Sequence, residues 1–119
     1  MEQSKTELLE RAGIDTADAL ARFMGNEALL ERFLKKFLDD PNYGALKAAM
    51  AMGDQAGAVT ASHTLKGMCG NLSMSRLSAL FTSQVALLRQ DDMAGAAGLM
   101  PEIAQAYEEA AAAIRRCFP

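Results

Sequence analysis

The sequence has no tryptophan, and phenylalanine and tyrosine together supply only 6% of its 119 residues. β-branched residues are few, and apolar and polar residues nowhere alternate persistently, so no strands are predicted. Half of the residues are nevertheless hydrophobic, and the dominant ones, alanine, leucine and methionine, are good helix formers. The composition therefore favours an all-α fold, and the length suits a single domain spanning 1–119.

Signals for several classes of protein are missing. No run of lysine and arginine marks a nucleic-acid surface, and the formal net charge is only −3. No apolar stretch approaches the ~18 residues that indicate a membrane span. The N-terminus lacks the apolar segment of a signal peptide. We therefore expect a cytoplasmic protein that binds neither nucleic acid nor a membrane.

Residues that bind metals or act as nucleophiles are also scarce. The two cysteines, Cys69 and Cys117, have neither metal-ligand nor CxxC spacing, and His63 is the only histidine. No Ser-His-Asp constellation is evident, and neither a P-loop nor a glycine-rich nucleotide box is present. We therefore expect no metal and no bound cofactor, and a metal-dependent or hydrolytic enzyme is a poor hypothesis.

Helical spacing of apolar residues begins early in the chain. A short helix is predicted around 14–24, with Asp15 as its N-cap. A broad apolar stripe follows from 27 to 50, interrupted by Pro41. We favour one long helix kinked at Pro41 over two separate helices.

Three more helices are predicted downstream. One covers 55–72, and the next starts at Ser73 or Ser75. The last runs roughly from 93 to 117, and Pro101 either kinks it or marks its true start.

Together these four amphipathic helices predict an up-down antiparallel four-helix bundle with a short additional N-terminal helix. The core of this bundle is expected to span about 26–117. Asn26 and Asp54 stand where N-caps of two of its helices are expected.

One helical face carries residues that stability does not require. On a helix, His63, Lys66, Gly67 and Gly70 lie at i, i+3, i+4 and i+7, away from the buried stripe that includes Leu65. Imidazole is a nitrogen nucleophile near neutral pH, and a lysine one turn away can offset the charge of a phosphoryl group. A glycine inside a helix costs ~1 kcal/mol relative to alanine, so two on one face favour a clearing for a partner or a phosphoryl group.

Each of these residues also has an ordinary structural explanation. A lone histidine is more often incidental than functional, and a lysine at this spacing is usually just solvated. Gly70 could equally permit close packing of two helices.

The sequence His63-Thr64-Leu65-Lys66-Gly67 is similar to the H-x-L-K-G signature of histidine-containing phosphotransfer (HPt) domains. The resemblance extends from about Ile14 to Arg89. It implies a four-helix bundle, a phosphorylatable His63, an assisting Lys66 and a small-residue clearing at Gly67, with Gly70 on the same docking face.

The resemblance also implies the partners. These are the receiver domains of response regulators, whose own aspartate and Mg²⁺ do the chemistry, and a hybrid histidine kinase. The chain would then be a monomeric phosphotransfer carrier rather than an enzyme. The sequence does not name the cognate partners or the direction of phosphate flow.

The chain departs from the family pattern on the following helix. Many members have a Glu or Gln there that hydrogen-bonds the imidazole, but this sequence has Val85, with Gln84 one residue earlier. One residue turns a side chain by about 100° on a helix. Gln84 therefore joins the docking face only if the helices are locally rotated, and otherwise it is a boundary residue of an amphipathic helix.

Two other functions remain open. The chain could be the phosphoacceptor domain of a chemotaxis-type histidine kinase, or a non-catalytic helical module for protein interaction.

Overall fold

The computed structural model describes all 119 residues and contains helices but no strand, which confirms the all-α prediction. The helices in chain order are α1 (Gln3–Arg11), α2 (Thr16–Arg22), α3 (Glu27–Leu38), α4 (Asn42–Met52), α5 (Gln55–Asn71), α6 (Ser75–Arg89), α7 (Met93–Gly98) and α8 (Met100–Cys117). No helix is both long enough and apolar enough to cross a bilayer.

The long kinked helix predicted around Pro41 is wrong, because α3 and α4 are separate helices. Proline lacks a backbone N–H and disfavours the helical conformation of the residue before it. Pro41 accordingly stands at the N-cap of α4. The Asp40 carboxylate accepts a hydrogen bond of 2.8 Å from the backbone N–H of Asn42, which helps the new helix to begin.

The predicted C-terminal helix is divided at Leu99 into the short α7 and the long α8. Pro101 lies in the first turn of α8. Its missing N–H is lost without cost there, because the first N–H groups of a helix have no intrahelical partner. Of the two alternatives left open by the sequence, Pro101 therefore marks the start of a helix rather than a kink.

The N-terminal region holds two helices instead of the single short one that was predicted. Asp15 caps α2 as expected, accepting a hydrogen bond of 3.1 Å from the backbone N–H of Asp18. The unexpected helix is α1, which packs against α8 and buries Leu9 completely. The stability of α1 depends on its packing against α8. Its own short, mostly polar sequence therefore did not show the spacing of apolar residues that predicts a helix.

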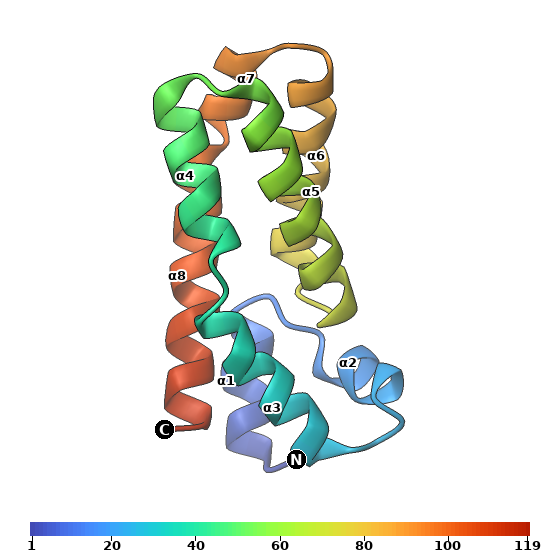
Figure 1. The fold of residues 1–119 in the computed structure, drawn as a ribbon. Coiled ribbons are helices and arrows are strands. Elements are labelled where there is room, and N and C mark those ends of the chain that lie inside the picture. Colours follow the sequence, from blue (N-terminus) through green and yellow to red (C-terminus); the bar gives the residue numbers. More distant parts are fainter.

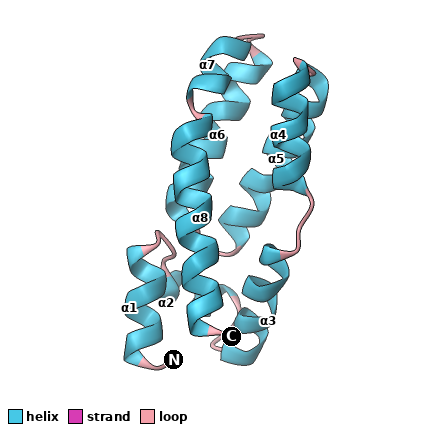
Figure 2. Cartoon of the chain, turned by 90° about the vertical axis from the view of Figure 1, so that its left-hand side faces the viewer, coloured by secondary structure: helices cyan, strands magenta, loops and turns pink.

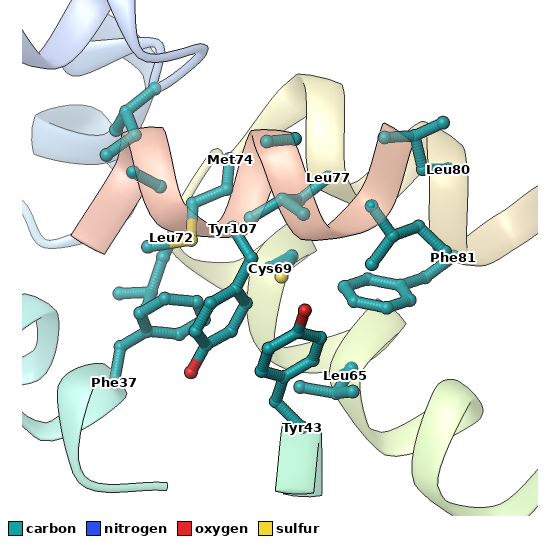
Figure 3. Close-up of a cluster of buried hydrophobic side chains, with 14 of the residues drawn as sticks. Phe37, Tyr43, Leu65, Cys69, Leu72, Met74, Leu77, Leu80, Phe81 and Tyr107 are labelled. Atoms are coloured by element: carbon teal, nitrogen blue, oxygen red, sulfur yellow. The ribbon is translucent and has the colours of Figure 1, made fainter. Parts of the chain in front are cut away.

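The hydrophobic core is one cluster that runs from Leu9 to Phe118. The cluster includes Leu9, Ala12 and Ile14, so residues before the predicted bundle also contribute to the core. Figure 3 shows part of it, where Tyr43 of α4 and Tyr107 of α8 stack with their ring centroids 4.0 Å apart. Cys69 is buried beside them, and burial raises the pKa of its thiol to about 12.

α5 lies between α4 and α6 (Figures 1 and 2). α5 and α6 are antiparallel, since Gln55 hydrogen-bonds the carbonyl of Leu88 while Ser62 hydrogen-bonds Gln84. α8 runs along α1, α3 and α6, and both chain termini lie at the same end of the molecule. This packing leaves the outer face of α5 uncovered.

Candidate functional site

The sequence of α5 fixes which of its faces is exposed. Asp54 caps the helix as predicted, accepting a hydrogen bond of 3.0 Å from the N–H of Gly57. Its buried side chains fall at helical spacing and pack against α4 and α6; they are Ala58, Ala61, Ser62, Leu65 and Cys69. Because a helix turns about 100° per residue, this buried stripe directs position 63 outward.

His63 is exposed, which confirms the predicted accessibility of its ring. The neighbouring hydroxyls do not engage it, because Thr60 and Thr64 donate to carbonyls of their own helix at 3.1 and 2.9 Å. An exposed imidazole without a competing protein partner can react with an electrophile brought by another molecule.

Lys66 lies on the same face, one turn from His63, and its side chain is half-buried. The ion pairs of the chain are formed by other residues, so no carboxylate of the protein neutralises the Lys66 ammonium. A free cation at this distance can interact with the oxygens of a phosphoryl group on His63.

Two glycines complete the face, and neither is needed for internal packing. A Cβ atom added at Gly67 would meet nothing within 4 Å. One added at Gly70 would approach the Oγ of Ser78 to 3.7 Å, which is an ordinary van der Waals contact. The close-packing explanation for Gly70 is therefore not required, and the position that leaves open space on the face of His63 is Gly67.

Near Gly70, the surface includes small residues of α6 that the sequence analysis did not identify. Gly70 shares a shallow depression with Ser78, Ala79 and Thr82. These three small residues stand at i, i+1 and i+4 on α6, and a run of small side chains at helical spacing is the signal that could have revealed them. The small residues of α6 and Gly70 thus lie together at this depression, which Arg22 of α2 and Met74 also line.

Gln84 does not belong to this surface. Its side chain is 0% exposed, so the prediction that it takes part in docking is wrong. Its Oε1 accepts a hydrogen bond of 2.8 Å from Ser62, and its Nε2 donates to the carbonyl of Ala96 at 3.2 Å. Gln84 joins α5, α6 and α7 inside the bundle, because a buried amide must find partners for both of its ends.

The position where the family often has a Glu or Gln is also buried, since Val85 is only 2% exposed. With Gln84 bonded elsewhere, neither residue offers a hydrogen bond to the imidazole of His63. The ring orientation is therefore not set by this part of α6.

We predict that replacing Gln84 by leucine destabilises the protein by about 1–3 kcal/mol, because the buried Ser62 hydroxyl loses its acceptor. The double variant Ser62→Ala/Gln84→Leu should recover part of this loss, since both polar partners are then gone. Urea unfolding followed by circular dichroism measures both. Equal stability of wild type and Gln84→Leu would contradict a structural role for this amide.

Comparison with known proteins gives one result. Neither the curated proteins nor the solved structures contain a match to the chain. A family model described as Hpt domain matches residues 27–113, which include all four residues of the His63 face. Hpt domains are phosphotransfer carriers of two-component signalling, not kinases, and they interact with response-regulator receiver domains and with kinases. The match covers most of the chain, and so this protein belongs to the Hpt domain family.

Proposed function

We propose that this protein is a phosphorelay intermediate that carries a phosphoryl group on His63 and exchanges it with the aspartate of a receiver domain. The observation that carries the proposal is the His63 face itself: an exposed imidazole, the unpaired cation of Lys66 and open space at Gly67. The Hpt family match covers this whole face.

The transfer needs no co-reactant. The unprotonated nitrogen of neutral His63 attacks the phosphorus of a receiver aspartyl phosphate. The N–P bond forms as the P–O bond to the aspartate breaks, and the aspartate leaves as a carboxylate. The reverse step returns the group to an aspartate. Lys66 offsets negative charge on the phosphoryl oxygens in either direction.

The partners follow from this chemistry and from the family. We place Mg²⁺ on the receiver domain, where it would neutralise charge around the phosphorylated aspartate. A hybrid histidine kinase would supply the phosphoryl group, and the relay would operate in the cytoplasm. We further propose that the carrier is a monomer.

In architectural terms we propose that the chain is an elaborated four-helix bundle. α3 and α4 together take the place of one helix of the bundle, and α5, α6 and α8 are the other three, in up-down antiparallel order. α1 and α2 are an N-terminal addition, and α7 is a cap between the ends of α6 and α8 (Figure 1).

A phosphotransfer profile tests the function. The protein is incubated with each phosphorylated receiver domain of the source organism. Any phosphoryl label transferred to it is then tested for its chemical stability in acid and in alkali. Phosphohistidine is acid-labile and alkali-stable, so label with these properties is expected. A protein that no receiver labels is a plain interaction module. Label that arrives only from a kinase catalytic domain with ATP indicates the chemotaxis-type alternative.

We predict that Lys66→Ala slows transfer about tenfold to a hundredfold, because one cationic contact to the transferring group is lost. The fold should persist, since Lys66 makes no ion pair in the protein. Rapid-quench transfer rates measure the effect, with Lys66→Arg as the charge-retaining control. An unchanged rate would exclude assistance by Lys66, and complete loss of labelling would make it essential rather than assisting.

A further inference from the structure

A polar pair lies in the core, one residue before His63 in the sequence. The hydroxyl of Ser62 donates a hydrogen bond of 2.8 Å to the Oε1 of Gln84 on α6. Among the buried serine, threonine and amide side chains of the protein, only these two are 0% exposed. The pair therefore links the helix that carries His63 to α6 from inside the bundle.

The amide of Gln84 is oriented by its partners. Its Nε2 donates to the backbone carbonyl of Ala96 at 3.2 Å, and a carbonyl can only accept. The Oε1 of the same amide then faces α5, where it accepts from the Ser62 hydroxyl. The direction of each hydrogen bond is thus fixed, and α5, α6 and α7 are joined at one point.

The neighbouring hydroxyls of α5 bond within their own helix. Thr60 and Thr64 each donate to the carbonyl four residues earlier on α5. A buried serine in a helix can be satisfied in the same way, so burial of Ser62 did not require an acceptor on another helix. Because Ser62 bonds across to α6 instead, its hydrogen bond constrains how the two helices are placed relative to each other.

Stability does not account for a polar pair at this place. The net gain from a buried neutral hydrogen bond is modest, and replacing both partners by apolar groups of similar shape can be nearly neutral. Apolar side chains would therefore hold α5 against α6 about equally well. What an apolar interface loses first is a unique arrangement, because cores lose rigidity before they lose stability.

The position of α5 on α6 depends on directional contacts of this kind. The buried residues that precede Ser62 on α5 are both alanines, whose short side chains interlock little. A second polar contact lies near the start of the helix, where Gln55 donates to the carbonyl of Leu88 at 2.8 Å. Hydrogen bonds tolerate only a narrow range of distance and angle, so these two limit both rotation and sliding of α5. His63 follows Ser62 directly, and its place in space is limited with it.

We propose that Ser62 and Gln84 are positioning residues for phosphoryl transfer. Their hydrogen bond sets the rotation and height of α5 on α6, and so the line along which the His63 imidazole meets the aspartyl phosphate of the receiver. The pair acts on the backbone that carries the imidazole and not on the ring itself, since both side chains are enclosed in the core. This inference rests on the proposed function, because it concerns the rate of the same transfer.

The double variant Ser62→Ala/Gln84→Leu tests the proposal. It removes both polar partners, and the Ala96 carbonyl keeps the N–H of Leu99 as a donor at 3.2 Å. With the receiver that labels wild type fastest, the transfer rate at saturation should fall about tenfold while KM stays within about twofold, since small displacements of reacting groups slow the chemical step and not docking. Ser62→Ala alone, the milder change, should lower the saturated rate in the same direction.

The matched control is Ile114→Val, which removes one carbon atom from the core near the C-terminal end of α8 and should leave both KM and the saturated rate unchanged. NMR supplies a readout that loss of stability alone would not move. His63 is the only histidine, so its imidazole gives one set of signals. These signals should be shifted or doubled in the double variant and unchanged in the Ile114→Val protein.

A folded double variant that transfers at the wild-type saturated rate would overturn the proposal, and transfer by wild type in the same assay would leave the proposed function intact. An equal fall in the Ile114→Val protein would also overturn it, because the rate would then follow stability. A raised KM with an unchanged saturated rate would overturn it too, because the pair would then shape docking and not the transfer step.

Discussion

His63→Gln is expected to abolish phosphoryl transfer to this protein altogether. The reason is chemical, because His63 is the only imidazole in the chain and glutamine has no comparable nucleophilic nitrogen. The change is expected to alter the free energy of unfolding by no more than ~0.5 kcal/mol, since the side chain is exposed and packs into no core. Incubation of both proteins with a labelled receiver domain, followed by gel separation, measures the transfer.

Thermal melts of the same two samples provide the control, because a misfolded variant would also fail to accept label. Peptide mapping of the labelled wild-type protein should place the phosphate on the peptide that contains His63. Equal label on wild type and His63→Gln would refute the assignment of His63 as the phosphoacceptor.

Gly67→Gln has the second largest expected effect, which is loss of transfer without loss of folding. The side chain of a helical residue leans toward the N-terminus of its helix, so a glutamine here would extend toward His63 on the same face. There it would occupy the space through which a receiver brings its aspartate. We expect transfer to fall by at least about a hundredfold, since displacing reacting groups by about 1 Å can cost this much.

The free energy of unfolding of the Gly67→Gln protein should rise, although its transfer rate falls. A Cβ at Gly67 meets nothing within 4 Å, and the position lies inside α5, where glycine costs up to ~1 kcal/mol relative to good helix formers. Gly67→Ala should give the same gain with a smaller loss of transfer, because it adds a single carbon atom. Gly98→Gln, which adds the same side chain at the end of α7, controls for nonspecific effects.

Urea unfolding and transfer rates on this series separate two explanations of Gly67. An unfolded Gly67→Gln protein would mean that the glycine serves internal packing. Normal transfer by a folded Gly67→Gln protein would mean that the receiver approaches His63 from another side.

The sequence alone was enough to predict the register of α5. Its buried residues recur at the period of a helix, so Leu65 and Cys69 face inward and His63 and Gly67 face outward in the structure. The caps at Asp15, Asn26 and Asp54 were equally predictable, because each side chain bonds a backbone N–H only three residues ahead. Such interactions involve only residues that are close in the sequence, and so the sequence alone predicts them.

The local sequence around Pro41 determines the chain conformation there only in part. The proline disturbs the helix wherever it occurs, and the sequence located that disturbance correctly. Whether the helix bends or ends there depends on what the flanking turns pack against. In the structure α3 packs against α8 and α4 packs against α5, so two separate helices form.

Other features were decided only by tertiary contacts. Gln84 falls at helical spacing with the buried Leu77, Phe81 and Leu88, but only Ser62 and Ala96 satisfy its amide and allow it to be buried. α1 packs against α8 and buries Leu9, and Ser73 hydrogen-bonds Asp18 and so holds α2 at the turn between α5 and α6. In each case the partner is at least 12 residues away in the sequence, so no local period or capping pattern reports it.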